Sequence, residues 1–353
     1  MKRFTKPFSG LAALALTMMP AYAASDMVPG EKFALQQWKI TLPIDQDGNG
    51  KVDEVDTNYL KNYQHEDFFY LDEQQHMVFV APNKGLTTQA SSNTRSELRQ
   101  MIRGYNTKIG TKDRGNNFAL KAHRRAKKFG SVGGQLQAVL KVDHVALNAG
   151  HPDKKPAYSV VVGQIHAGKD QELIEKGDGF GWGNEPIKIY YKKLPGHEKG
   201  SVFWTYERNL AKDDPNRTDI AFPVWGNTWE NLDDPGKEGI SLGEYFSYAI
   251  LVHENTMYVK FIAKDHPEVV YQVDLSNNID PNGKEDKLDN PKGYSQDWFY
   301  FKAGAYNQCS TKNDTLYWYT ACPGTGNWQE DKANGDYTQV SFAQLTVKNI
   351  KKK

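Results

Sequence analysis

The chain has 353 residues and a formal net charge of +1, from 44 basic and 43 acidic side chains. A nucleic-acid-binding protein usually has a clear basic excess, so this balance argues against that class, and affinity for any polyanion must come from local placement of Arg and Lys. Tyr, Phe and Trp number 19, 16 and 8, a composition that favours β-strands.

The first residues have the pattern of a secretory signal peptide. A basic start precedes the short apolar run 11–19, and Ala21-Tyr22-Ala23 matches a small-x-small cleavage site. This run is too short to span a membrane, and no other segment approaches the roughly 20 apolar residues that a span needs. We therefore expect residues 1–23 to be removed, and residues 24–353 to form one domain of a secreted or periplasmic protein without membrane contact.

The segment 45–56, DQDGNGKVDEVD, has the spacing of an EF-hand loop, with oxygen-bearing side chains at the ligand positions and Gly at the turn. Those side chains are Asp45, Asp47, Asn49, Asp53 and Asp56. No flanking helices are expected, so calcium bound here would be structural. A polar turn without an ion explains the same residues, and both interpretations stay open.

Alternating apolar and polar residues predict strands along most of the chain. The predicted strands are 134–143, 158–166, 187–192, 298–308 and 338–347, with a hairpin over 246–262 that turns at Glu254-Asn255. Polar stretches rich in Gly and Asp predict loops at 45–56, 147–156, 167–185, 211–219, 231–239 and 276–296. Only 58–64 suggests a short helix, so the fold class is all-β, an antiparallel sandwich or β-jelly roll, and the lack of helices argues against a βαβ architecture.

Three charged side chains share one face of the segment TRSELR. Because side chains alternate along a strand, Arg95, Glu97 and Arg99 point the same way and line either solvent or a polar cleft. Guanidinium groups grip carboxylates in a bidentate manner, so a cleft would suit a carboxylate ligand, with Glu97 holding both arginines. The alternative is an exposed strand face whose ion pairs contribute little.

Two further strand faces carry polar groups. Gln164 and His166 end an apolar strand on one face, where Gln could hydrogen-bond a carboxylate and neutral His could act as a base, although a lone His is more often structural. In YFKAGAYNQ, the polar and aromatic face suits a sugar, and Gly leaves room for a ligand or a backbone. That face holds Tyr300, Lys302, Gly304, Tyr306 and Gln308, and an ordinary solvent-exposed face is the alternative.

Together these motifs resemble one family. RSELR at 95–99, QIH at 164–166 and YFKAGAYNQ at 300–308 are similar, in this order, to the three signatures of the polysaccharide lyase family 7 alginate lyases. WKITLP at 38–43 is similar to that family's N-terminal strand, and the resemblance covers residues 32–347. It implies a β-jelly roll with a concave substrate groove, and β-elimination at the 1,4-bonds of alginate, a mannuronate and guluronate polymer, to give unsaturated oligosaccharides.

Matching positions imply roles for individual residues. Arg95 and Gln164 would neutralise the uronate carboxylate, His166 would assist and could take the C5 proton, and Tyr306 would act as acid and, where geometry permits, as base. Removing a proton beside a carboxylate builds up negative charge, which such donors stabilise. No metal or organic cofactor is required. The residues expected to orient the sugar are Glu97, Arg99, Tyr300, Lys302 and Gln308.

Other functions fit parts of the pattern. A glycoside hydrolase would need two carboxylates around the bond, and the three faces supply only Glu97. A sugar-binding module would not require Gln164, His166 and Tyr306 together. Lyase action on another polyuronate such as glucuronan also stays open. By resemblance, Ile165 favours guluronate-containing blocks; endolytic or exolytic action is left undecided.

The chain has two cysteines, Cys309 and Cys322. Export to an oxidising compartment favours a disulfide between them, and two free thiols are the alternative.

We expect the protein to be a monomer.

Overall fold

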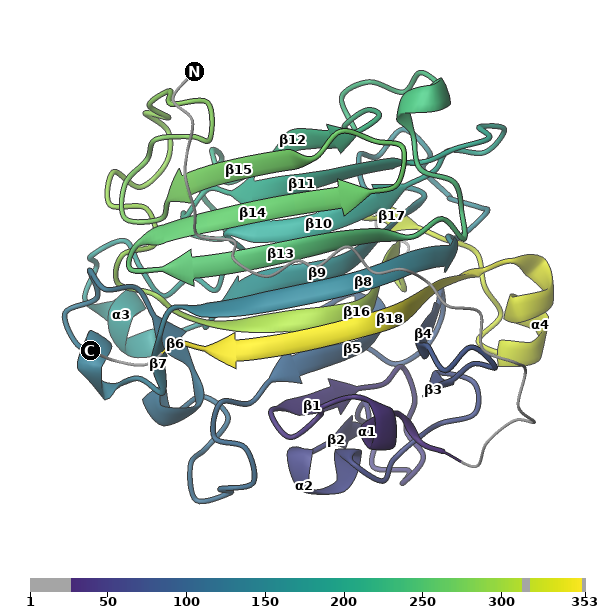
Figure 1. Cartoon of the computed structure of the whole chain (residues 1–353), viewed down its shortest axis with the longest axis horizontal. Coiled ribbons are helices and arrows are strands. Elements are labelled where there is room, and N and C mark those ends of the chain that lie inside the picture. The colour runs from purple at the N-terminus through teal and green to yellow at the C-terminus, as the bar shows by residue number, and fades with distance from the viewer. Residues whose placement is uncertain (1–26, 313–317, 351–353) are drawn as a thin grey trace.

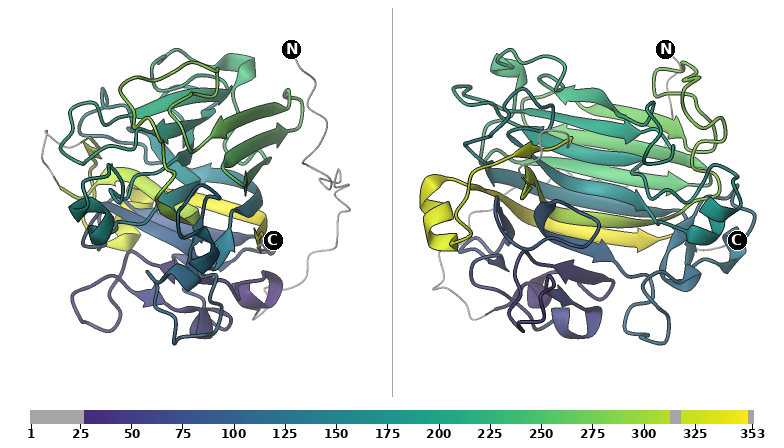
Figure 2. Two further views of the ribbon diagram at one scale, coloured as in Figure 1. Left: turned by 90° about the vertical axis from the view of Figure 1, so that its left-hand side faces the viewer. Right: turned by 180° about the vertical axis from the view of Figure 1, so that it is seen from behind.

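The computed structural model describes residues 27–312 and 318–350, in which two mainly antiparallel β-sheets pack face to face (Figures 1 and 2). The expected signal peptide lies outside these residues. No helix in the described part of the chain combines the length and hydropathy that a membrane crossing needs.

The larger sheet lies behind the other in the view of Figure 1. Its strands are, in spatial order, β12 (Asp219–Trp225), β11 (Ser201–Glu207), β10 (Ile187–Lys192), β9 (Ser159–Ala167), β16 (Trp298–Ser310), β5 (Asn93–Gln100), β1 (Trp38–Thr41) and β2 (Glu54–Val55). The short strands β6 (Phe118–Ala119) and β17 (Thr320–Ala321) pair with β16, and β7 (Ser131–Val132) pairs with β6.

The smaller sheet has seven strands and one solvent-facing side. Its spatial order is β15 (Val269–Asp274), β14 (Thr256–Ala263), β13 (Phe246–His253), β8 (Gly134–His144), β18 (Tyr337–Asn349), β4 (Met77–Pro82) and β3 (Phe69–Leu71). Along β8 buried and half-buried residues alternate, as a sheet with one core face and one wet face requires.

Helices are short and lie at the edges of the sandwich. They are α1 (Pro29–Lys32), α2 (Thr57–Leu60), α3 (Gln171–Glu175) and α4 (Trp328–Asn334), with 3-10 turns η1 (Arg114–Asn116), η2 (Ala126–Lys128) and η3 (Gly236–Glu238). The predicted helix at 58–64 is therefore confirmed only for its first turn. The loop predicted at 167–185 contains α3.

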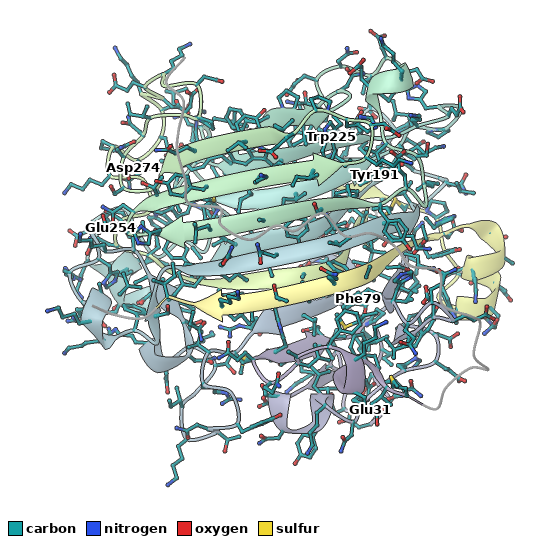
Figure 3. The ribbon with its side chains drawn as sticks, viewed as in Figure 1. Glu31, Phe79, Tyr191, Trp225, Glu254 and Asp274 are labelled. Atoms are coloured by element: carbon teal, nitrogen blue, oxygen red, sulfur yellow. A yellow bond between two sulfur atoms is a disulfide. The ribbon has the colours of Figure 1, made fainter. Side chains whose placement is uncertain are left out.

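One large hydrophobic core fills the space between the sheets. Phe79 from β4 and Trp225 from β12, labelled in Figure 3, belong to it, as do Phe301, Ala303 and Ala305 of β16. Because the apolar face of β16 enters this core, its polar face lies on the opposite side of the larger sheet. That side carries the candidate site.

The strands predicted from alternation are confirmed to within a few residues, including the hairpin at Glu254-Asn255. The strands β4 and β11 were not predicted, because every residue in them is buried and their sequences do not alternate. A strand buried on both faces has no periodicity of two.

Candidate active site

The three motif-bearing strands lie side by side, with β16 between β9 and β5. In this register Lys302 is opposite Arg99 on β5 and opposite Gln164 on β9, and Tyr306 is opposite Arg95. The motif on β5 is more than 60 residues from the motif on β9, which is more than 130 residues from the motif on β16. The three motifs nevertheless contribute to one polar surface. The sequence placed these side chains on strand faces, and the sheet order brings the faces together.

Glu97 is the centre of this surface and is only 2% exposed. Its carboxylate accepts hydrogen bonds from Nη1 of Arg95 at 3.0 Å and from Nε2 of Gln164 at 2.5 Å, and forms an ion pair with Lys302. We expected Glu97 to hold Arg95 and Arg99. That expectation is wrong for Arg99, because Lys302 from the neighbouring strand forms the second ion pair with Glu97.

The charges of this cluster depend on one another. Burial alone would raise the pKa of Glu97, but Lys302 and Arg95 outweigh it and keep that pKa below its usual value. Burial, with Arg95 nearby, lowers the pKa of Lys302 to about 8. With all three groups ionised the cluster has one excess positive charge, so it favours an incoming anion.

Tyr306 lies directly against Arg95. The guanidinium carbon is 4.0 Å from the centroid of the Tyr306 ring, a cation–π contact. Both side chains also meet Ser91: its Oγ accepts from Nη2 of Arg95 at 2.9 Å and lies 3.5 Å from the Tyr306 hydroxyl. Ser91 precedes the RSELR motif in a loop, and nothing in its sequence context marked it.

Gly304 allows β16 to approach β5 closely. Its φ is +146°, and a Cβ atom there would lie 2.5 Å from the carbonyl oxygen of Ser96. Only Gly fits such a position. A register shift against β9 lies between Ala303 and Tyr306, so the strand is irregular next to the catalytic candidate. The sequence predicted that either a ligand or a backbone comes close to Gly304, and the structure shows the backbone of β5 there.

Arg99 points to the edge of the site. Its guanidinium donates to the carbonyl oxygens of Gln100 and Thr111 at 2.6 and 2.9 Å and to Oδ1 of Asn117 at 2.7 Å. It also lies 4.0 Å from the centroid of the Tyr300 ring. These contacts fasten the loop after β5 and support Tyr300, and the expected contact of Arg99 with the sugar stays a prediction.

Gln308 lies where the pairing of β16 with β5 becomes irregular. A register shift against β5 separates Tyr306 from Ser310, and the Gln308 amide donates to the carbonyl oxygens of Tyr306 and Asn307 at 3.1 and 3.4 Å. These bonds stabilise the irregular end of β16. They give no support to the expected sugar contact.

His166 stacks on Tyr300 with ring centroids 5.2 Å apart. Its Nδ1 is 2.5 Å from the carbonyl oxygen of Ala167, and its Nε2 is 3.0 Å from Oε1 of Glu185. Burial lowers the pKa of His166. Glu185 falls in a segment that the sequence suggested only as a loop, so it was missed.

The polar surface continues onto β10. Lys188 is opposite Gln164 and forms ion pairs with Asp219 at 2.9 Å and Glu185 at 3.5 Å. It was not predicted, although IKIYYK alternates and places Lys188 and Tyr190 on one face.

Aromatic side chains crowd the Tyr306 end of the site. Tyr306 packs in a cluster with Val161, Tyr190, Phe203 and Trp229. The Trp229 ring meets those of Tyr190 and Phe203 edge-on, at 5.2 and 5.3 Å. Trp229 is 3% exposed, so this aromatic cluster is buried.

Two further predictions concern a metal site and a disulfide. Asp45, Asp47 and Asp53 bring carboxylate oxygens within 4.8 Å of one another, a set that suits calcium. Asp56 does not join them, because it caps α2 and pairs with Arg103 at 2.5 Å; its assignment as a ligand is corrected. The expected disulfide joins Cys309 to Cys322, with Cα atoms 5.3 Å apart.

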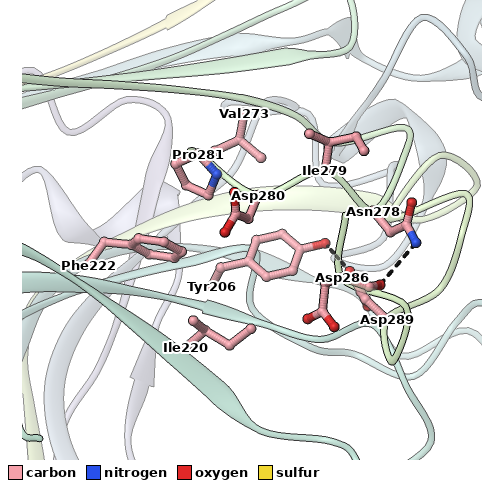
Figure 4. Close-up of a pocket in the computed structure, with 10 residues that line it drawn as sticks. All are labelled: Tyr206, Ile220, Phe222, Val273, Asn278, Ile279, Asp280, Pro281, Asp286 and Asp289. Carbon is pink, nitrogen blue, oxygen red and sulfur yellow. Dashed lines mark hydrogen bonds between the residues drawn. The ribbon is translucent and has the colours of Figure 1, made fainter. Parts of the chain in front are cut away.

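A separate hollow opens between β11, β12, β15 and the loop that follows β15 (Figure 4). Tyr206 donates to Asp289 there at 2.7 Å, while Ile220, Phe222 and Val273 supply apolar walls. It contains none of the motif residues, so we do not assign the candidate site to it.

Comparison with known proteins decides the family. The family model described as alginate lyase matches residues 33–349. This chain belongs to the polysaccharide lyase family 7 alginate lyases. An alginate lyase from Klebsiella pneumoniae is 36% identical over 311 residues, which cover 85% of this chain and 91% of that protein. The chain is therefore a polysaccharide lyase that acts on alginate.

Solved structures of alginate lyases agree with the fold. The crystal structure of the Klebsiella pneumoniae alginate lyase has a TM-score of 0.70 and 32% identity, covering 91% of this chain and 98% of that one. The exolytic family 7 enzyme AlyA5 from Zobellia galactanivorans has the same score and identity, covering 92% and 99%. The predicted β-jelly roll is confirmed.

Proposed function

We propose that this alginate lyase cleaves the 1,4-glycosidic bonds of alginate by β-elimination and releases unsaturated uronate oligosaccharides. The observation that carries the proposal is the buried cluster of Arg95, Glu97, Lys302 and Gln164 beside Tyr306. Two cations and an amide gathered around one carboxylate offer donors for the uronate carboxylate. A hydroxyl adjoins them for proton transfer.

The elimination step balances without an added reagent. A base removes the C5 proton, a double bond forms between C4 and C5, the C4–O4 bond breaks, and an acid protonates the departing O4. Arg95 and Gln164 stabilise the negative charge that builds on the carboxylate as C5 loses its proton. Tyr306 supplies the acid, and either Tyr306 or His166 supplies the base.

For substrate preference, we propose guluronate-containing blocks. Ile165 is fully buried and packs in the core between the sheets, opposite Ile187. It would influence the sugar only through the placement of Gln164 and His166 on either side. Parallel assays on poly-guluronate, poly-mannuronate and glucuronan rank these substrates.

For the mode of attack, we propose exolytic cleavage. The buried aromatic cluster beside Tyr306, with Trp318 packed against Trp229, would limit how far a polymer continues past the catalytic candidate. The structurally similar AlyA5 is described as exolytic. A polymer would then enter from the Tyr300 side of the surface.

For cofactors and cellular context, we propose a monomer that is exported after loss of residues 1–23 and needs no cofactor for the reaction. Calcium at Asp45, Asp47, Asn49 and Asp53 would serve stability alone. Mass spectrometry of the exported protein tests the cleavage site, and gel filtration tests the monomer.

The decisive experiment compares purified wild type and Tyr306→Phe on alginate by ultraviolet absorbance of the conjugated double bond. Loss of the proton-transferring hydroxyl should reduce kcat about 10²–10⁴-fold. Tyr245→Phe is the matched control, since its hydroxyl contacts His76 at 3.1 Å outside the site and its loss should leave kcat unchanged. Near-normal turnover by Tyr306→Phe would refute the mechanism; binding without any absorbance in wild type would favour a sugar-binding module.

A further inference from the structure

The two ring nitrogens of His166 are both engaged. Nδ1 is 2.5 Å from the carbonyl oxygen of Ala167, which can only accept a hydrogen bond, so Nδ1 carries a hydrogen. Nε2 is 3.0 Å from a carboxylate oxygen of Glu185. At that distance two lone pairs would repel, so a proton must lie between Nε2 and Glu185.

We propose that Glu185 is a positioning residue that shares one proton with Nε2 of His166 and so sets the orientation and the charge of the His166 ring at the site. This inference rests on the proposed elimination.

The backbone around Glu185 is held on both sides. Ala167 donates its N–H to the carbonyl oxygen of Asn184 at 2.9 Å, which joins this loop to the end of β9. The N–H of Glu185 donates to Oε2 of Glu207 at 2.9 Å, which joins it to β11. The Glu185 side chain is 17% exposed and the His166 side chain 26%. The pair is thus fixed at the site and shielded from most of the solvent.

The surrounding charges keep Glu185 able to support a cation. Burial would raise its pKa, but Lys188 and His166 outweigh burial and hold that pKa well below its usual value. Burial lowers the pKa of His166, and the Glu185 carboxylate offsets part of that decrease from its position 3.0 Å from Nε2. The other groups that face the pair are Lys302, Arg95 and Tyr300 around His166, and Glu207 and Arg217 around Glu185.

The test is the histidine ring titration by NMR, with the His166 signal assigned by its absence in His166→Asn. In Glu185→Gln the carboxylate is lost while its shape remains, so the His166 titration should move to lower pH by at least about one pH unit. The limb of the kcat/KM profile that His166 controls should move by the same amount. Glu185→Asp should restore part of the shift.

Glu244→Gln is the matched control, because Glu244 faces Nε2 of His266 at 3.5 Å outside the site and its loss should move neither readout. An unmoved His166 titration in Glu185→Gln would overturn the proposal. If that variant does not fold, the nitrogen chemical shift of His166 Nε2 in the wild type is the second test. A shift typical of an imidazole nitrogen without hydrogen near neutral pH would overturn the proposal. Absence of elimination would refute the proposed function while the NMR result still stood.

Discussion

Lys302 has lost most of the water that normally surrounds a lysine side chain. It is 7% exposed, forms an ion pair with Glu97, and lies 5.8 Å from the Tyr306 ring centroid. Desolvation destabilises the charged form of a buried amine, and Arg95 adds repulsion. Loss of the Lys302 proton at high pH would therefore lower the net charge of the site.

We predict weaker alginate binding above about pH 8. The pKa of Lys302 is about 8, and the protonated, cationic form attracts the uronate carboxylate; as pH rises through this value the charge is lost and KM should rise. KM measured from pH 6 to 10 checks this. In Lys302→Arg the charge persists to high pH, so the rise should disappear. An equal rise in both proteins would assign the effect to another group.

The irregular strand β16 joins the two halves of the site. Its pairing with β5 keeps one register from Lys302 to Tyr306 and places Tyr306 against Arg95, while its pairing with β9 shifts between Ala303 and Tyr306. Gly304 permits this course because no side chain stands between the two strands. The positions of the catalytic candidates therefore depend on the shape of this one element.

We predict that Gly304→Ala lowers Tm and activity together. The residue would face both an unfavourable φ and the Ser96 oxygen at 2.5 Å, and strain of this kind costs about 1–3 kcal/mol. Gly283→Ala is the control, since Gly283 also has positive φ, +80°, but nothing lies within 4 Å. Thermal unfolding monitored by circular dichroism should show the larger loss for Gly304→Ala. Equal losses would mean that crowding is unimportant.

The loop from Asp45 to Asp53 is a separate element with its own prediction. If its clustered carboxylates bind calcium, the ion binds the native state and Tm should rise with calcium and fall with a chelator. Asp47→Asn should abolish the difference, and kcat should be the same under both conditions. A Tm that does not respond to calcium in wild type would return this loop to an ordinary polar turn.

At the scale of the whole molecule, segments far apart in the sequence meet beside the Tyr306 end of the site. Trp229 follows β12 and meets Trp318 edge-on at 5.6 Å, and Trp318 comes four residues before Cys322 of the disulfide. The proposed exolytic attack depends on this contact between distant segments.

We predict that alginate viscosity falls slowly relative to the number of double bonds formed. Exolytic attack releases short products from chain ends, so most polymer length survives early in the reaction. Parallel viscometry and ultraviolet absorbance check this. Trp229→Ala, which removes part of the buried aromatic cluster, should give a steeper fall in viscosity per double bond; a steep fall already in wild type would show internal cleavage.

The sequence by itself determined the all-β class, most strand positions, the disulfide partners and the three polar faces, because these follow from short-range alternation and from motifs a few residues long. It could not predict that Glu97 pairs with Lys302 in place of Arg99, since strand order is a long-range property. It missed Ser91, Glu185 and Lys188, which reach the site only through tertiary contacts. It also gave no sign of the irregular pairing of β16 with β5 around Gln308, which depends on the neighbouring strand.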